Sequence, residues 1–258
     1  MSAPQVQVYP DAGQLAKAAA AQLAGRIAGA VAASGSASLV LTGGGIGTEI
    51  LAELARGPVS GEIDWPRCDI WWGDERFVPE GDPERNETGA RSALLDHVGV
   101  NAARVHPMPA SDGPDGDDPD AAAARYAAEL RAAAAPGDPE ALPPFDVLLL
   151  GIGPEGHVAS LFPELPAVFE KDRTVVAVTG SPKPPPTRLS LTFRAIQRAR
   201  EVWILAAGAE KAPAVARALS GTAPADCPAA GARGQQQTLF LLDRAAAAQL
   251  PPELCPAS

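Results

Sequence analysis

The sequence predicts an α/β fold, a single Rossmann-like domain over residues 1–258 with a mostly parallel central sheet and helices on both faces. The unbroken aliphatic run at 147–150 is typical of a parallel strand that is buried on both faces. Segments with helical spacing of apolar residues alternate with such runs along the chain. Glycine-rich turns follow two of the runs directly, at 42–47 and 151–156. Because ligands bind at the carboxyl ends of parallel strands, we expect a site at these turns.

The composition narrows the class of protein. A chain of 258 residues, 46% of them hydrophobic, is long enough for one large α/β core. The formal net charge of −10 argues against a nucleic-acid or acidic-membrane partner, although basic residues that converge locally could still bind a phosphate-bearing small molecule. The three cysteines lack metal-ligand spacing, so we expect neither a disulfide framework nor a zinc site. With no leader-like or membrane-length apolar run, a cytoplasmic protein is predicted.

The elements follow in order from local patterns. Residues 5–9 alternate weakly and predict an edge strand. Asp11 can cap a helix, and apolar residues at helical spacing from Leu15 to Val31 extend that helix to about residue 33. Further strands are predicted at 38–41, 68–72, 174–179, 201–206 and 239–242. Further helices are predicted at 48–56, 84–97, 119–135 and 210–219, with a short Ala-rich helix after Asp243.

The glycine loop at 42–47 opens a predicted helix. Backbone N–H groups of Gly43, Gly44, Gly45 and Ile46, together with the positive helix end, suit a phosphate group. The spacing matches neither the P-loop nor the dinucleotide fingerprint. On this pattern alone, a tight structural turn is an equal alternative.

Two more clusters follow predicted strands. Asp74 and Arg76 come directly after the strand at 68–72, where a mutually paired surface cluster is the alternative to a site. His157 follows the turn at 151–156, where we expect another helix to begin, and Glu155 lies two residues before it. A neutral imidazole is a suitable general base near pH 7. A surface histidine on an ordinary turn is the alternative, and the other polar clusters at strand ends favour a site.

Three cations complete the candidate set. Lys183 and Arg188 lie in the extended, proline-rich segment 181–188, which can hold both over a pocket or serve as a linker. Lys211 lies in the first turn of the helix predicted at 210–219, where it opposes the helix dipole. An anionic ligand explains that position better than helix stability does.

The chain resembles the 6-phosphogluconolactonases over essentially its full length. The motifs that carry the resemblance are WGDERFVP (72–79), ERN (84–86), LLGIGPEGHVASLFP (149–163), SPKPPPTRLSLTF (181–193) and, more weakly, GAEKAPAV (208–215). The wider family includes glucosamine-6-phosphate deaminases, in which an Ala-Phe-Asn-Glu-Pro type of sequence follows the histidine. Here Val-Ala-Ser-Leu-Phe-Pro follows it, which favours the lactonase branch.

The resemblance implies hydrolysis of 6-phospho-D-glucono-1,5-lactone to 6-phospho-D-gluconate in the oxidative pentose phosphate pathway. It makes His157 the general base. Glu155 could orient the imidazole ring, and Asp74 and Arg76 line the sugar end or brace the histidine, so the sequence leaves open whether Asp74 or Glu155 is the closer partner of His157. It assigns the phosphate to the glycine loop with Lys183, Arg188 and Lys211. It implies no metal, cofactor or nucleotide, a sugar-phosphate lactone as the only partner, and a monomer or weak oligomer.

The chain departs from the family pattern in two places. Its loop reads Thr-Gly-Gly-Gly-Ile-Gly where lactonases often have Ser-Gly-Gly-Ser-Thr-Pro, so phosphate contacts would come mainly from backbone N–H groups. Glu155 stands where many members have Asp. Backbone N–H groups of the turn before His157 are candidates for binding the oxyanion. A sugar-phosphate isomerase or deaminase, and a non-catalytic sugar-phosphate sensor, are the alternative functions.

Overall fold

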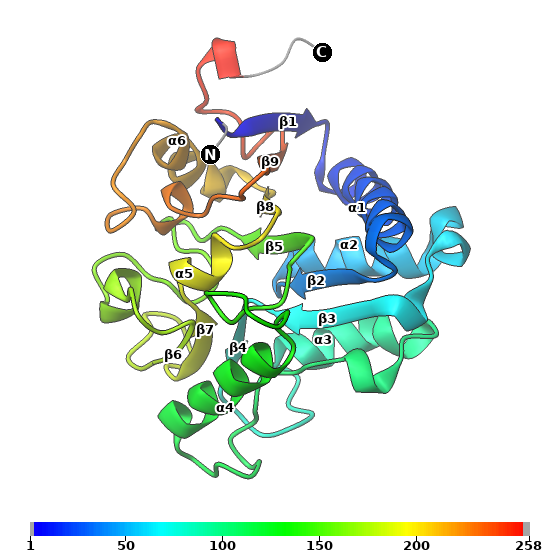
Figure 1. Ribbon diagram of the computed structural model, residues 1–258. Coiled ribbons are helices and arrows are strands. Elements are labelled where there is room, and N and C mark those ends of the chain that lie inside the picture. Colours follow the sequence, from blue (N-terminus) through cyan, green and yellow to red (C-terminus); the bar gives the residue numbers. More distant parts are fainter. Residues whose placement is uncertain (1–2, 255–258) are drawn as a thin grey trace.

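The computed structural model describes residues 3–254, and Figure 1 shows how the helices and strands are arranged. A six-stranded sheet forms the centre, and every neighbouring pair of its strands is parallel. Its order is β1 (Gln5–Tyr9), β9 (Gln237–Asp243), β8 (Glu201–Ala206), β5 (Val147–Gly151), β2 (Ala37–Leu41) and β3 (Cys68–Trp72). All of β2, and β5 as far as Leu150, is buried, as expected for aliphatic strands covered on both faces.

The helices flank this sheet. They are α1 (Ala12–Ser34), α2 (Gly45–Arg56), α3 (Asn86–Ala93), α4 (Pro119–Ala132), α5 (Phe193–Ile196) and α6 (Ala212–Leu219). The shorter 3-10 helices are η1 (Pro58–Glu62), η2 (Trp65–Arg67), η3 (Leu95–His97), η4 (Ala102–Arg104), η5 (Pro166–Phe169), η6 (Ala209–Lys211), η7 (Pro228–Ala230) and η8 (Pro252–Leu254). In Figure 1, α2 and α3 lie behind the sheet, and α4 lies below it. The predicted α/β fold with a mostly parallel central sheet is confirmed.

Helix α1 begins and ends where the sequence predicts. The Asp11 side chain accepts the N–H of Gln14 at 2.8 Å, which satisfies one of the free donors of the first turn. Gly35 ends the helix with φ 84°, a left-handed conformation that glycine adopts without a Cβ clash. The predicted end near residue 33 agrees with this.

A second, antiparallel sheet has the order β4 (Asp74–Arg76), β7 (Arg188–Leu191) and β6 (Val175–Val178). The sequence predicted that residues 74–76 directly follow the strand at 68–72, but it did not predict that they form a strand of a second sheet. The chain leaves β3 at Gly73, and Asp74 then pairs with Ser190 and Arg76 with Arg188. The second sheet thus brings residues separated by more than 100 positions to one place.

The helix expected to begin at His157 and Ser160 does not form. Positive φ angles at Gly156 (94°), Ala159 (49°) and Glu164 (62°) are incompatible with a right-handed helix. The segment therefore runs as successive turns until η5.

Other boundaries differ from the predictions. The helix predicted at 84–97 is split, because α3 ends before Leu94, whose φ of −142° breaks the helix, and η3 follows. The Ala-rich segment after Asp243 forms turns instead of a helix, with the Asp243 carboxylate accepting the N–H of Ala246 at 2.7 Å. Helix α2 begins at Gly45, earlier than expected, and α4 ends at Ala132.

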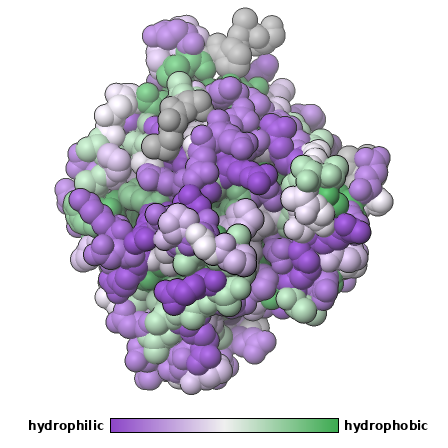
Figure 2. Space-filling view, viewed as in Figure 1, coloured by the Kyte–Doolittle hydropathy of each residue, from purple (hydrophilic) through white to green (hydrophobic). Residues whose placement is uncertain are grey.

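Figure 2 shows mainly hydrophilic residues on the visible surface. Inside the protein, the hydrophobic core includes a cluster of aromatic side chains around Trp71. Trp71 of β3 stacks on His106 with ring centroids 3.8 Å apart, and Tyr126 of α4 meets Trp71 edge-on. Carboxylates of Asp69 and Glu129 lie 3.6 and 2.6 Å from the two His106 ring nitrogens. Within residues 3–254, no helix combines the length and apolar character needed to cross a membrane.

The His106 cluster should make stability depend on pH. Burial lowers the pKa of His106, but the two carboxylates outweigh burial and raise it to about 9. The folded pKa exceeds the unfolded value near 6.5, so the stabilisation is full below pH 6.5 and is lost as pH rises through 9. Since the carboxylates are partly exposed and screened, we expect a loss of about 1–2 kcal/mol.

Urea unfolding, followed by tryptophan fluorescence from pH 6 to 10, measures this loss. His106→Gln should flatten the fall in unfolding free energy, whereas His97→Gln, at an exposed histidine, should leave it unchanged. A His106→Gln protein with the wild-type slope would assign the pH dependence to other groups.

Candidate functional site

A cavity of about 160 Å³ lies at the carboxyl ends of β2 and β5. Eight of the eleven predicted site residues line it: Gly43, Gly44, Asp74, Arg76, His157, Lys183, Arg188 and Lys211. Thr42, Asn86, Gly151, Ile152, Gly153 and Ala159 complete the lining. Segments far apart in the sequence therefore converge where the parallel strands end, as expected for this class of sheet.

A larger cavity of about 700 Å³ lies between α4 and the segments at 139–141 and 172–175. Two of its arginines already have carboxylate partners, Arg194 with Glu140 at 2.8 Å and Arg173 with Glu170 at 2.7 Å. Its lining contains no histidine. The smaller cavity is lined by a histidine and by more cationic than anionic side chains, so we take it as the candidate site.

His157 pairs with Glu155. The His157 Nδ1 lies 2.9 Å from a Glu155 carboxylate oxygen, close enough for an ion pair but outside the angles of a good hydrogen bond. Burial raises the pKa of Glu155, yet His157 and Lys183 outweigh it and lower the pKa to about 2. The carboxylate is therefore charged and favours a proton on Nδ1. The other ring nitrogen, Nε2, is then the one available to a ligand.

The turn before His157 fixes the position of the ring. Gly153 donates its N–H to the His157 carbonyl at 2.9 Å, and Gly156 donates to the Gly153 carbonyl at 2.9 Å. A Cβ at Gly153 would collide with the His157 ring, so only glycine fits there. These two N–H groups are used inside the turn. The expectation that amides of this turn bind an oxyanion is therefore wrong for Gly153 and Gly156.

Asp74 does not contact His157 but belongs to a separate network. Its Oδ2 accepts a hydrogen bond from the Ser160 hydroxyl at 2.7 Å and lies 3.9 Å from Nη1 of Arg188. Its Oδ1 accepts from the side-chain amide of Asn86 at 3.3 Å. Sequence alone left open which carboxylate supports His157, and the structure places Glu155 there.

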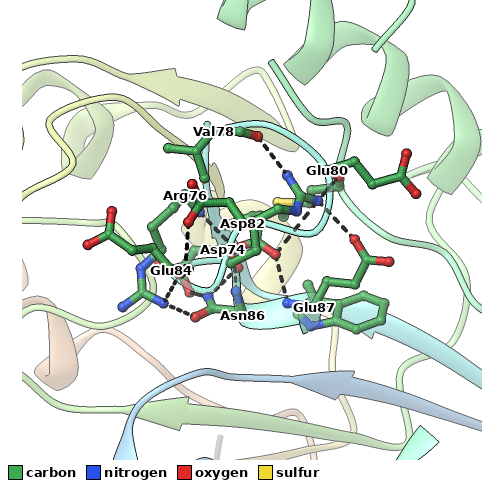
Figure 3. Close-up of polar contacts among 12 residues, drawn as sticks. Asp74, Arg76, Val78, Glu80, Asp82, Glu84, Asn86 and Glu87 are labelled. Atoms are coloured by element: carbon green, nitrogen blue, oxygen red, sulfur yellow. Dashed lines mark hydrogen bonds and ion pairs between the residues drawn. The ribbon is translucent and has the colours of Figure 1, made fainter. Parts of the chain in front are cut away.

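Arg76 and Asn86 lie side by side at the cavity, as Figure 3 shows. The Arg76 guanidinium donates to the Asn86 side-chain oxygen and to the carbonyl of Glu84, the latter at 3.0 Å. A Cβ at Gly43 would collide with the Asn86 amide, so this glycine makes room for it. Asn86 is a cavity residue that the sequence reasoning did not assign. The ERN motif at 84–86 was the signal that could have identified it.

Arg188 holds the proline-rich segment in place. Its Nη2 donates to the carbonyls of Lys183 and Pro184 at 3.3 and 3.2 Å, and its Nε donates to that of Pro185 at 3.3 Å. The guanidinium also lies over the Phe162 ring, 5.8 Å from the centroid. Only Nη1 remains for Asp74 and the cavity. Arg188 therefore shapes the segment that carries Lys183.

Lys183 and Lys211 bring two ammonium groups to the cavity. Burial and the charge of Lys183 lower the pKa of Lys211, and Glu210 and Glu155 offset this only in part. Lys183 lies 3.4 Å from a Glu155 oxygen. Because the cations outweigh the nearby carboxylates, the cavity suits an anion.

The glycine loop contributes through its backbone. Thr48 donates the first helical hydrogen bond of α2, to the Gly44 carbonyl at 3.0 Å, so the preceding amides have no acceptor in the helix. Gly45 lines an adjoining hollow of about 370 Å³, and the Ile46 side chain packs against the core. Gly45, Ile46 and Glu155 thus lie next to the cavity and do not line it.

Comparisons with known proteins identify the same family. The family model for glucosamine-6-phosphate isomerases/6-phosphogluconolactonase matches residues 10–241. A 6-phosphogluconolactonase of Streptomyces coelicolor is 60% identical over 253 residues, which is 98% of this chain and 97% of the relative. One from Mycobacterium tuberculosis is 56% identical over 246 residues, which is 95% of this chain and 98% of the relative.

Solved structures agree with the sequence comparisons. A 6-phosphogluconolactonase from Trypanosoma brucei superposes with a TM-score of 0.83 at 30% identity, covering 96% of this chain and 99% of that one. A monomeric glucosamine-6-phosphate deaminase shares the fold, with a TM-score of 0.77 at 23% identity over 95% of this chain and 99% of its own. The chain belongs to the glucosamine-6-phosphate isomerase/6-phosphogluconolactonase family, as its motifs predicted.

Proposed function

We propose that this chain hydrolyses 6-phospho-D-glucono-1,5-lactone to 6-phospho-D-gluconate, with His157 as general base, in the oxidative pentose phosphate pathway. Relatives that are 56–60% identical over nearly the whole chain bear the name 6-phosphogluconolactonase. The observation that carries the proposal is the cavity itself. A carboxylate-paired histidine and three cations, Lys183, Arg188 and Lys211, line the same small space.

In the proposed reaction, Nε2 of His157 takes a proton from water while the water oxygen bonds to C1 of the lactone. The bond between C1 and the ring oxygen then breaks, and the imidazolium returns the proton to that oxygen. The product acid ionises near neutral pH. Glu155, which is charged, orients the ring and stabilises the imidazolium between the two steps.

The substrate phosphate is a near-dianion in a protein of net charge −10, so it requires a local cationic site. We assign it to Lys211, Lys183, Arg188 and the backbone N–H groups of the loop at 43–46. Asp74 and Arg76 line the same cavity, and we assign them to the sugar end of the lactone.

We further predict that the protein forms a single domain over 1–258 and requires no metal or cofactor. We also predict a monomer or weak oligomer located in the cytoplasm.

His157→Ala should lower kcat about 10²- to 10⁴-fold with freshly prepared phosphorylated lactone, because general-base assistance is lost. Glu155→Gln should be milder, on the order of tenfold, if it only orients the ring. Product formation above spontaneous hydrolysis is the measurement, and glucosamine 6-phosphate should not be turned over. Near-native kcat in His157→Ala would exclude this histidine as the base.

Lys211→Ala should lower kcat/KM for the phosphorylated lactone about 10- to 100-fold, since it removes a charge-assisted contact. Unphosphorylated gluconolactone should be affected little, and added salt should weaken the wild type more than the variant. Lys171→Ala, at an exposed lysine, is the matched control. Equal losses with both substrates would argue against a phosphate site at Lys211.

Gly153→Ala should abolish most activity while the protein still folds, because the added methyl group displaces the His157 ring. Gly99→Ala places a methyl group in open space and should behave as wild type. Comparing kcat and melting temperature of the two variants separates misplacement of the base from general destabilisation. Wild-type kcat in Gly153→Ala would show that the ring can shift without penalty.

A further inference from the structure

Glu75 is a fully buried carboxylate directly beside the cavity, with no exposed surface. Its neighbours in β4, Asp74 and Arg76, line the cavity. Successive side chains of a strand point to opposite faces, so Glu75 points away from the cavity. The proposed reaction gives it no role.

Glu75 accepts three backbone hydrogen bonds. One oxygen accepts the N–H of Arg76 at 2.8 Å and that of Asn86 at 2.6 Å. The other oxygen accepts the N–H of Glu87 at 2.9 Å and lies 3.8 Å from Nη2 of Arg85. The Arg85 side chain does not cap α3, so Glu75, from another element, satisfies the free donors at the start of that helix.

Through these contacts Glu75 determines where Asn86 lies. The Asn86 amide nitrogen donates to the Asp74 carbonyl at 2.8 Å and to its carboxylate at 3.3 Å, while its oxygen accepts from Arg76. Figure 3 shows Asn86 between these two side chains. A shift of the first turn of α3 would therefore move both cavity residues.

A helix cap by itself does not need a carboxylate. Burial raises the pKa of Glu75 to about 7, although Arg85 and the three N–H donors act in the opposite direction. Burying a carboxylate is costly, and a neutral side chain such as Ser or Asn caps a helix without that cost. What the carboxylate adds is two oxygens that reach Arg76, Asn86 and Glu87 together.

We propose that Glu75 is a positioning residue for the reaction: it fixes Asn86, and through Asn86 it orients Asp74 and Arg76 in the cavity. This inference deepens the proposed function and rests on it.

The test is a double-mutant cycle between Glu75→Gln and Asn86→Ala. The glutamine keeps the shape but turns an NH₂ group toward the N–H of Glu87 and toward Arg85, so the start of α3 must shift. We expect kcat to fall about tenfold with both phosphorylated and unphosphorylated lactone, because the phosphate cations are untouched. In the Asn86→Ala background, Glu75→Gln should cost less than about twofold. Additive losses would overturn the proposal.

Asp146→Asn is the matched control. Asp146 is another buried carboxylate that accepts a backbone N–H, that of Ser38 at 2.8 Å, but it precedes β5 at the opposite end of the sheet. The Asp146→Asn variant should have a lower free energy of unfolding while its kcat stays near the wild-type value. If Glu75→Gln does not fold, Glu75→Asp, which is too short to reach all three amides, replaces it in the cycle.

A readout without turnover separates this inference from the proposed function. The side-chain amide signals of Asn86, measured by ¹⁵N NMR, should move in Glu75→Gln and remain in place in Asp146→Asn. Unmoved Asn86 signals in Glu75→Gln would overturn the positioning role. A wild-type protein that does not hydrolyse the lactone would overturn the proposed function instead, and the NMR result would still decide whether Glu75 positions Asn86.

Discussion

The parallel arrangement of the central sheet constrains everything around it. The strands β2 and β5 at its centre are covered on both faces, and apart from Ser38 their side chains are apolar. Polar groups near these strands therefore gather where they end, and β2, β3 and β5 each end in a glycine-containing turn near the cavity. Glycine at 43 and 153 lets Asn86 and His157 approach the backbone more closely than any other residue would allow. The cavity is therefore a consequence of how the strands terminate.

Cationic side chains outnumber carboxylates around the cavity at the carboxyl ends of the strands. Glu155 is shared between His157 and Lys183, and Asp74 lies near Arg188, so each carboxylate already has a cation. Among the described residues, no carboxylate forms an ion pair with Arg76 or Lys211, and burial next to Lys183 makes the charge of Lys211 costly. An arrangement of this kind is unfavourable for the protein alone and becomes favourable when a dianion binds. Under the proposed function, these cations lower the stability of the free protein and raise its affinity for the substrate phosphate.

Two buried carboxylates, Asp146 and Glu75, lie near opposite ends of the central strands. Asp146 accepts the Ser38 N–H at the amino end of the sheet and Glu75 accepts three N–H groups near the carboxyl end. Both satisfy backbone donors that no neighbouring strand or helix reaches. Only Glu75 is connected, through Asn86, to side chains of the cavity. A buried carboxylate that accepts backbone N–H groups therefore stabilises the fold at Asp146, and at Glu75 it also positions residues of the cavity.

Sequence by itself determined what depends on near neighbours. The aliphatic runs predicted the central strands, Asp11 predicted the start of α1, and the short separation of Glu155 from His157 made Glu155 one of two candidate partners. Tertiary structure decided what depends on distant segments. The antiparallel pairing of β4 with β7 brings Asp74 beside Ser190, and Glu75 sets the start of α3, which places Asn86 in the cavity. Local patterns encode periodicity and turns, whereas these contacts join residues brought together only when separate elements pack, so no local pattern specifies them.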